Sequence, residues 1–327
     1  MRLLFVLIIV LAFSNVSQSQ ELKVFGEVNF TLEDTGTYRV LGVNENYLVW
    51  FDFQMGTLFM YNIEKNEMSE KEFSQGRGPS EYMQPTSMYV DEEDVVYLSD
   101  FPNSKLIVWN IKEERFQDDI RLNVPPFRIA RNENSLYIFN LTNPVQPINL
   151  LELDTRKETP IDLEGGFFEN SKPNEVLFNR DGSFMYVSNQ VIHLSKHKSA
   201  LFIFSVGADK DILKVNTIEL AKKQEIGIKE TKLADGSVQQ NLDVTKLLQS
   251  QSFAKHPTKE ANLLIVFRDN RSKPVYYSKS IYTYSLNNEK IESEKSSKFD
   301  FSIDQIVANN SQVFALSEEK GKIFILE

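Results

Sequence analysis

Short apolar runs separated by polar turns follow one another along the chain. A typical pair is Val95-Val96-Tyr97-Leu98, which ends at Ser99-Asp100, and Leu106-Ile107-Val108-Trp109, which begins after a polar turn. Runs this short, and this rich in β-branched and aromatic side chains, are typical of strands, whereas a helix needs a longer segment with a 3.6-residue period. The pattern therefore predicts an all-β protein built from strands and tight turns.

The strand pattern repeats at a regular spacing. Residues 52–64 (DFQMGTLFMYNIE) align without a gap with residues 100–112 (DFPNSKLIVWNIK), which lie 48 positions further on. Weaker copies of strands from this unit are found at 135–140, 184–189, 263–268 and 313–317. Repeats of this period indicate a solenoid, a propeller or an array, and six units of roughly 50 residues suit the four-stranded blades of a propeller. We therefore expect residues 20–327 to form a single domain, a six-bladed β-propeller.

The last unit of the repeat has only three predicted strands, over residues 304–309, 311–316 and 322–327. A fourth strand is available at the other end of the chain, where apolar residues alternate with polar ones as in a half-buried strand. These apolar residues are Leu22, Val24, Val28, Phe30 and Leu32. Insertion of this N-terminal strand into the last blade would close the ring and remove two exposed sheet edges.

One spacing between units is irregular. The strands at 184–189 and 263–268 lie 79 positions apart, which is well above the roughly 50 residues of a regular blade. We interpret the excess as an insertion near residues 221–252, in which Asp235-Gly236 predicts a hairpin turn. Val244, Leu247 and Leu248 share one face of a helix, which predicts a helical part. A degenerate seventh blade is the alternative, which we favour less.

Residues 1–19 have the organisation of a secretory signal peptide. Arg2 supplies positive charge, residues 3–13 form an unbroken apolar run, and Ser17-Gln18-Ser19 suits a signal peptidase. The run is too short to span a bilayer comfortably, so we expect an exported chain with no membrane span after cleavage. An uncleaved anchor and a buried N-terminal strand are the alternatives. Because no cysteine is available for lipid attachment, we expect a periplasmic or extracellular protein that is not a lipoprotein.

Composition indicates which residues form the core and which partners and reactions are not expected. Aromatic residues make up 12% of the chain, and Tyr61 and Trp109, which recur at matching places, are expected in the core between blades. The formal net charge is −10, and an acidic surface repels phosphate backbones, so nucleic acid is not expected as a partner. Without cysteine the chain has neither disulfides nor thiolate chemistry.

The most distinctive segment is Gln75-Gly76-Arg77-Gly78-Pro79-Ser80-Glu81-Tyr82. It resembles the Gly-Arg-Gly-Pro-Gly-Glu-aromatic loop of six-bladed propeller proteins that are common in Bacteroidetes and often described as TolB-like. The stretch that follows, up to Leu106, is similar to one NHL repeat. Ser80 stands where the resembled loop usually has glycine. The resemblance implies an envelope or extracellular propeller, and it implies little about activity.

The glycines of this loop indicate a structural connector first. Gly76 and Gly78 permit unusual backbone angles and the following proline fixes its own φ, as a tight link between two blades requires. Arg77 is also a candidate ligand contact, with Glu81 and Tyr82 beside it, because a guanidinium group suits carboxylates and phosphates. Arg77 and Glu81 are alternatively expected to pair across the turn. The motif lacks the Lys-Ser/Thr ending of a P-loop, which argues against nucleotide binding.

Catalytic and metal-binding patterns are weak. His193 and His197 are four residues apart in a strand or hairpin context, where they lie too far apart to share an ion. Asp52 and Asp100 recur at one position of the unit and are expected to stabilise turns. We therefore predict no catalytic residue, no metal ligand and no cofactor. A calcium ion bound by Asp and Asn oxygens needs no signature spacing and stays open.

These features favour a non-catalytic binding or scaffold protein of the cell envelope, with an unknown protein, peptide or glycan as ligand. The alternative is a propeller enzyme, such as a lactonase-like hydrolase or a lyase, which holds a cation near the axis. A role in sensing or in polysaccharide uptake is a third, narrower hypothesis. In each case we expect the ligand at one mouth of the central channel, where loops held by a rigid scaffold converge.

Overall fold

The computed structural model describes most of the chain from residue 21 onwards. The described residues are 21–28, 39–143, 146–163, 182–197, 199–207, 212–220, 227–232, 237–243, 248–269, 276–287 and 290–327. The expected signal peptide, residues 1–19, lies outside them. Within these ranges there is no helix with the length and hydrophobicity that a membrane crossing requires.

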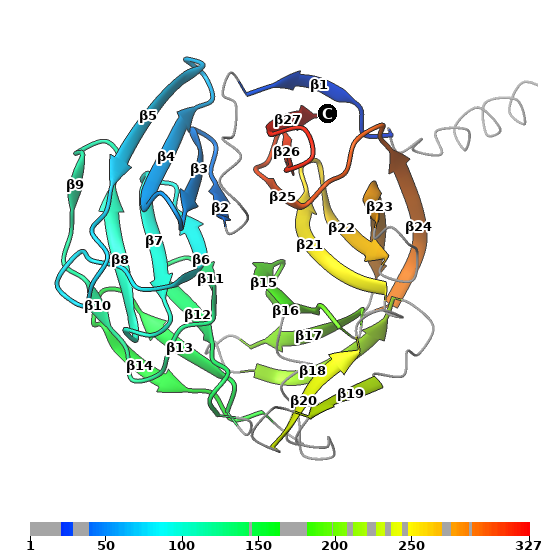
Figure 1. Ribbon diagram of the computed structural model, residues 1–327. Helices are drawn as coiled ribbons and strands as arrows, with labels where there is room; N and C mark the ends of the chain where they lie inside the picture. The colour runs from blue at the N-terminus through cyan, green and yellow to red at the C-terminus, as the bar shows by residue number, and fades with distance from the viewer. Residues whose placement is uncertain are drawn as a thin grey trace, which may run out of the picture.

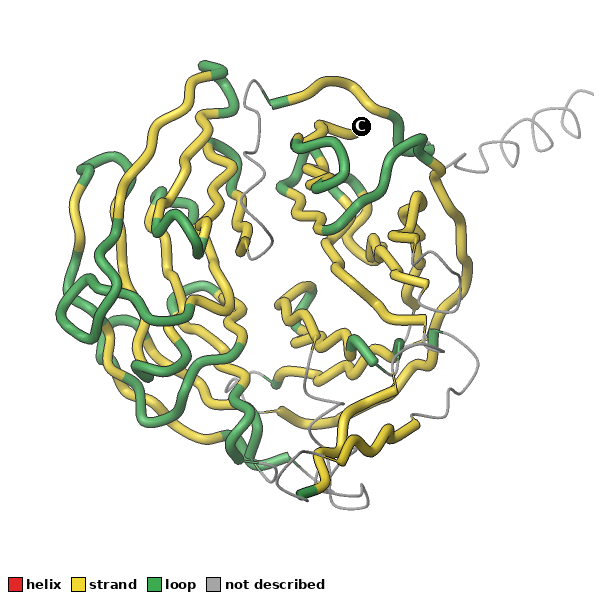
Figure 2. Tube along the Cα trace, in the orientation of Figure 1, coloured by secondary structure: helices red, strands yellow, loops and turns green. Residues whose placement is uncertain are grey.

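The strands form a ring of antiparallel sheets around a central axis (Figure 1, Figure 2). Six of these sheets are the blades, and within blades 1 to 5 the strands follow chain order from the axis outwards. The structure thus confirms the predicted six-bladed β-propeller. Residues 95–100, 135–140, 263–268 and 313–317 fall on the second strand of their blades, counted from the axis. Residues 184–189 fall on the first strand of their blade, so the predicted match of that copy is wrong by one strand.

The blades have the following strands. Blade 1 contains β2 (Arg39–Val43), β3 (Tyr47–Asp52), β4 (Thr57–Asn62) and β5 (Glu67–Glu72). Blade 2 contains β6 (Pro85–Val90), β7 (Val95–Asp100) and β8 (Lys105–Asn110), with β9 (Arg115–Phe116) and β10 (Ile120–Arg121) both paired to β8. Blade 3 contains β11 (Arg128–Asn132), β12 (Ser135–Phe139), β13 (Ile148–Glu152) and β14 (Lys157–Pro160).

The second half of the ring continues the pattern. Blade 4 contains β15 (Gly182–Val187), β16 (Gln190–Ser195), β17 (Ala200–Val206) and β18 (Ile212–Glu219). Blade 5 contains β21 (Leu248–His256), β22 (Lys259–Asp269), β23 (Tyr276–Asn287) and β24 (Lys290–Lys298). Blade 6 contains β25 (Gln305–Ala308), β26 (Val313–Ser317), β27 (Lys322–Leu326) and, on its outside, β1 (Val24–Glu27).

Strand β1 closes the ring, as the sequence predicts. It pairs antiparallel with β27, and backbone hydrogen bonds between Lys23 and Glu327 extend the pairing beyond the strand. Leu22 and Val28 are buried, at 7% and 3% exposure. The predicted burial of Val24 is wrong, because the strand register shifts between Val24 and Gly26 and leaves Val24 46% exposed. Phe30 and Leu32 lie outside the described residues.

The irregular spacing corresponds to a separate two-stranded sheet between blades 4 and 5. Strands β19 (Gly227–Lys232) and β20 (Val238–Asp243) pair with each other antiparallel. Asp235-Gly236, Val244 and Leu247 lie outside the described residues. Leu248, which the sequence predicts in a helix, is the first residue of β21, so that prediction is wrong. The run that follows it pairs along the whole of β22, which favours the extended form.

Each pair of neighbouring blades encloses its own hydrophobic core. Trp109 is 3% exposed and packs with Phe51 in the core between blades 1 and 2. Tyr61, 4% exposed, packs with Trp50 in the core between blades 6 and 1. The expectation of inter-blade burial for Tyr61 and Trp109 is confirmed. Since each blade contributes to two cores, the loss of one blade exposes two apolar faces to water.

The six innermost strands surround the axis and all run along it in the same direction. At their first residues Gln305 Nε2 donates to the Arg39 carbonyl oxygen at 2.9 Å, and at their ends Asn309 Nδ2 donates to the Asn44 carbonyl oxygen at 3.2 Å. The channel therefore has two different mouths. We call the end at Arg39 and Gln305 the connector mouth, because links between blades arrive there. The end at Asn44 and Asn309 is the turn mouth, because it carries the hairpins that follow each inner strand.

Candidate functional site

A cavity of about 890 Å³ follows the axis of the ring, and residues of all six inner strands line it. Its walls combine apolar residues, such as Val40 and Met88, with charged residues near both mouths. Pockets that bind small molecules have this size and this combination of apolar walls with a few polar groups. The channel is therefore the principal candidate site.

Three basic residues, Arg39, Arg128 and Lys196, line the connector mouth. Arg128 ties three blades together, because Nε donates to the Gly182 carbonyl oxygen and Nη1 to the Thr86 carbonyl oxygen, both at 2.7 Å. Its guanidinium also stacks on the ring of Phe127, 4.0 Å from the centroid. Arg128 thus presents a positive charge to the channel in an orientation fixed by its neighbours.

A group of carboxylates lies at the junction of blades 6 and 1, and two of them lie within 4 Å of Arg39. Arg39 Nε contacts Asp52 at 3.1 Å and Nη1 lies 3.8 Å from Glu318. Asp304 accepts a hydrogen bond from the Glu318 backbone N–H at 2.8 Å. Burial raises the pKa of Asp304, and burial together with the neighbouring Asp304 raises the pKa of Glu318. These carboxyl groups support the connector mouth and do not line the cavity themselves.

The turn mouth is bound together by a belt of polar contacts between blades. Asn44 Nδ2 donates to the carbonyl oxygen of Asp91 and to Oδ1 of Asp94, each at 2.6 Å. Arg131 in turn pairs with the Asp91 carboxylate, and Asn309 connects blade 6 to Asn44. Neither the repeat nor the connector motif predicts this belt. Its signal is present in the chain, since Asn44, Asp91 and Asn309 each directly follow an inner strand.

The inside of the turn mouth carries aromatic and charged side chains. Tyr89 and Tyr186 line the cavity and are half-buried. Burial raises the pKa of Tyr89, so its phenol stays protonated at neutral pH. Glu45, Glu92 and Lys255 complete the charged lining together with Arg131. This mouth therefore has charges of both signs, whereas the charged lining of the connector mouth is basic.

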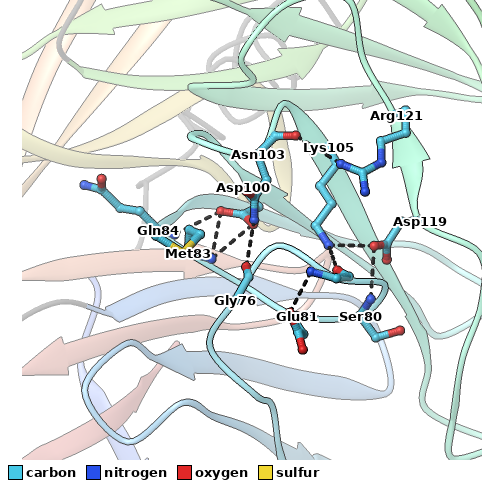
Figure 3. Close-up of polar contacts among 11 residues, drawn as sticks. Gly76, Ser80, Glu81, Met83, Gln84, Asp100, Asn103, Lys105, Asp119 and Arg121 are labelled. Carbon is cyan, nitrogen blue, oxygen red and sulfur yellow. Dashed lines mark hydrogen bonds and ion pairs between the residues drawn. The ribbon is translucent and has the colours of Figure 1, made fainter.

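The predicted loop at residues 75–82 forms a braced connector between blades 1 and 2 (Figure 3). The Glu81 carboxylate accepts a hydrogen bond from the Gly78 N–H at 2.6 Å. Asp100 accepts from the N–H groups of Met83 and Gln84. Asn103 donates to the Gly76 carbonyl oxygen at 3.0 Å, so β7 and the turn after it hold both ends of the loop.

A buried ion pair also holds the backbone of this loop in place. Lys105 Nζ contacts Asp119 at 2.6 Å and donates to the Gly78 carbonyl oxygen at 2.8 Å. The Lys105 side chain is fully buried and that of Asp119 is 7% exposed. Asp119 also accepts from the Ser80 N–H at 3.0 Å. Ser80 has a φ of 58°, in the left-handed region that favours glycine, which explains why the resembled loop usually has glycine there.

The three residues predicted as ligand contacts are placed differently. Arg77 is exposed, Glu81 is half-buried and Tyr82 is 5% exposed in the core against Phe51. None of them lines the channel cavity. Arg77 and Glu81 do not form the expected pair, and the Glu81 carboxylate accepts a hydrogen bond from the Gly78 N–H instead. Of the three, Arg77 is the residue open to a ligand, and its contact with one stays a prediction.

The recurring aspartates stabilise turns, as predicted. Asp52 accepts from the N–H groups of Gln54 and Met55 in its own turn, and Asp100 performs the same task for the connector loop. His193 is fully buried between Phe139 and Phe202. Among the described residues no group of three or more His, Asp or Glu side chains is arranged to hold a metal ion.

The ring and its channel define the class of protein as a six-bladed β-propeller. The profile of the DUF5128 family, described as a 6-bladed beta-propeller, matches residues 33–278, and the chain belongs to this family. A comparison with curated protein sequences finds no match.

Solved structures with the same fold have diverse functions. A Bacteroides fragilis protein predicted to be exported is 12% identical, with a TM-score of 0.54 over 96% of this chain and 97% of that chain. Staphylococcus aureus virginiamycin B lyase is 11% identical, with a TM-score of 0.54 over 94% and 98%. Kuenenia stuttgartiensis hydrazine synthase is 8% identical, with a TM-score of 0.53 over 95% and 97%. At these identities the likeness concerns the fold alone.

Proposed function

We propose that this protein is an exported, non-catalytic binding protein whose ligand occupies the central channel. The observation that carries this proposal is the 890 Å³ cavity lined by all six inner strands. Hydrogen bonds across blade boundaries, such as those of Arg128 and Asn44, hold both mouths in place without a ligand. A preformed cavity of this kind costs little ordering on binding.

The binding proposal is tested by blocking the channel. Ser183 is half-buried and lines the cavity, so Ser183→Trp fills part of it with a large side chain. The probes are a panel of unblocked short peptides and of neutral and acidic oligosaccharides, with binding measured by calorimetry. We expect a bound probe to lose at least about tenfold in affinity, roughly 1.4 kcal/mol. The matched control, Ser296→Trp, is exposed on β24 and should bind normally. Binding that Ser183→Trp leaves unchanged, or no binding by any probe, contradicts the proposal.

The connector loop provides a second arm of this experiment. If Arg77 reaches the ligand, Arg77→Ala weakens binding while the melting temperature stays nearly constant, because the side chain is exposed. If the loop is only a connector, the substitution changes neither quantity by more than about 0.5 kcal/mol.

Export is tested on the full chain with its native N-terminus. We expect expression in a Gram-negative host to give a mature protein that begins near residue 20, since Ser17-Gln18-Ser19 suits signal peptidase. Intact-mass spectrometry of the purified protein measures the N-terminus. A protein that still begins at Met1 contradicts cleavage.

One observation favours the alternative of a propeller hydrolase or lyase. Asp304 and Glu318 are neighbouring carboxyl groups with raised pKa values, and Glu318 lies 3.8 Å from Arg39; such groups are typical of acid–base pairs. Lactonase activity on a chromogenic lactone that is lost in Asp304→Asn, with the fold retained, would support the enzyme. The binding role is preferred because neither carboxyl group lines the cavity.

A further inference from the structure

The turn mouth contains two charged side chains that the scaffold does not use. Glu92 lies in the hairpin after β6, and Lys255 lies near the end of β21. Both line the cavity. Neither side chain has a hydrogen-bond or ion-pair partner within the described part of the chain.

These two charges face each other across the axis. Glu92 belongs to blade 2 and Lys255 to blade 5. In a ring of six, blades three positions apart lie on opposite sides of the channel, as β6 and β21 do in Figure 1. The mouth thus has a negative wall and a positive wall with the cavity between them.

The other charges at this mouth are already neutralised or bonded. Arg131 pairs with Asp91, and Asp94 pairs with Lys112 at 2.8 Å. Glu45, on the same side as Glu92, accepts a hydrogen bond from the Asn310 N–H at 3.0 Å. The charged side chains of this mouth that have no partner in the described part of the chain are therefore one carboxylate and one ammonium group on opposite walls, and Glu45 adds negative charge on the side of Glu92.

The side-chain amides of Asn44 and Asn309 at the rim are also occupied. Asn44 Nδ2 makes two hydrogen bonds to blade 2, and its Oδ1 accepts from the N–H groups of Asn46 and Tyr47. Asn309 Nδ2 donates to Asn44 while its Oδ1 accepts from Ser311 and Gln312. These two amides, which could otherwise bind the hydroxyl groups of a neutral sugar, are thus committed to holding the blades together, whereas the exposed Asn310 uses only its backbone N–H in this way. An uncharged ligand would also leave Glu92 and Lys255 partly desolvated without a partner.

We propose that the turn mouth binds a short peptide-like zwitterion, with its cationic end at Glu92 and its anionic end at Lys255. The half-buried rings of Tyr89, in blade 2, and Tyr186, in blade 4, also line the cavity and offer apolar surface for the body of the ligand. This inference rests on the proposed ligand binding in the channel and specifies the chemical class of the ligand.

The experiment measures retention of random peptides by the immobilised full-length protein. The probe is a library of unblocked peptides of about two to five residues, so that a range of lengths is sampled at about 3.3–3.6 Å per extended residue. The comparison probe is the same library with acetylated N-termini and amidated C-termini. We expect the unblocked library to be retained at low salt and the blocked library to be retained less, as quantified by mass spectrometry.

Variants then test whether Glu92 and Lys255 each contribute to peptide retention. Glu92→Gln and Lys255→Gln should each lower retention by about two- to fivefold, the effect of an ion pair open to water. The charge-swapped variant with Glu92→Lys and Lys255→Glu should restore retention, because the ligand can bind in the reverse direction. Matched controls are Glu93→Gln and Lys259→Gln, which lie in the same hairpins but do not line the cavity, and they should leave retention unchanged.

Two results overturn the proposal. One is equal retention of the blocked and unblocked libraries, or variants at Glu92 and Lys255 that behave like their controls. The other is binding of a neutral oligosaccharide whose affinity falls in Ser183→Trp but is unchanged in the variants at Glu92 and Lys255. The second result leaves ligand binding in the channel intact, so failure of this inference is distinguishable from failure of the proposed function.

Discussion

Gly76 and Gly78 leave room for the carboxylate of Glu81. A Cβ atom on Gly76 would lie 2.1 Å from Glu81 Oε2, and one on Gly78 would lie 2.9 Å from the same atom. The need for glycine at these positions is therefore one of space around Glu81. The sequence indicates glycine for backbone freedom, and the structure gives close approach as the physical reason.

We expect Gly76→Ala to destabilise the protein by about 1 kcal/mol, because the Glu81 side chain must move away and lose its hydrogen bond from the Gly78 N–H. In a Glu81→Ala background the same substitution should cost clearly less, because the conflicting carboxylate is gone. Urea unfolding of the four proteins in this double-mutant cycle measures the coupling. Equal costs in both backgrounds would show that Glu81 is not the obstacle.

The pKa of Asp304 predicts a pH dependence. Because burial raises this pKa in the folded state, the group's favourable contribution is complete below the pKa of a free aspartate and is lost as the pH rises through the raised value. Asp304→Asn removes the charge and keeps an oxygen that accepts the Glu318 N–H. We therefore expect the variant to melt about 1–3 °C above the natural protein at pH 7. This advantage should vanish near pH 4, a result that thermal melts at the two pH values check. A constant difference between them would rule out Asp304 as the titrating group.

At the scale of elements, the connector loop is joined to blade 2 through Lys105 of β8. A fully buried lysine at the start of a strand has no periodic signature, because its burial depends on Asp119, which follows only after the turn at 111–114 and β9. The sequence identifies the loop from its glycines. It could not identify the ion pair beneath the loop, because that contact exists only once β8 and the connector are folded together.

Lys105→Met should cost about 3–5 kcal/mol, because it leaves the Asp119 carboxylate buried without its partner. The double variant with Lys105→Met and Asp119→Leu should recover part of this loss, since it removes both charges. The exposed pair of Arg115 and Glu113 is the control, and Arg115→Met should cost less than about 1 kcal/mol. Denaturant unfolding measures all three, and a small loss in Lys105→Met would mean that the pair contributes little to stability.

The inner strands illustrate how far sequence reasoning extends to the site. The repeat predicts the ring and hence a channel, because apolar runs and turns recur at blade spacing. It does not indicate which side chains face the axis, since the inner strands are short and partly polar. Glu92 and Lys255 resemble ordinary surface charges in the sequence, and only the ring places them on opposite walls of one mouth.

At the scale of the whole molecule, β1 makes the stability of the ring depend on both ends of the chain. Deletion of residues 20–28 should remove the outer strand of blade 6 and the buried side chains of Leu22 and Val28. Because the blades share their cores in a closed circle, we expect a lower melting temperature for the entire cooperative transition, and not only fraying at one end.

Calorimetry of this deletion variant measures the effect. Deletion of residues 227–243, which contain the separate sheet of β19 and β20, is the matched control and should change the melting temperature much less. An unaltered cooperative melt after loss of residues 20–28 would mean that the ring does not need its N-terminal strand.

Ring closure also determines the order in which the blades form during synthesis. Glu27 of β1 and Lys322 of β27 are partners across 295 residues, so the first strand made must wait for the last. At about 5–20 residues per second, roughly 15–60 s of synthesis separate the two. During that interval five blades can form from neighbouring segments, whereas the sixth has no complete sheet. Its completion depends on an encounter between the two ends of the chain, which makes closure the expected slow step of assembly.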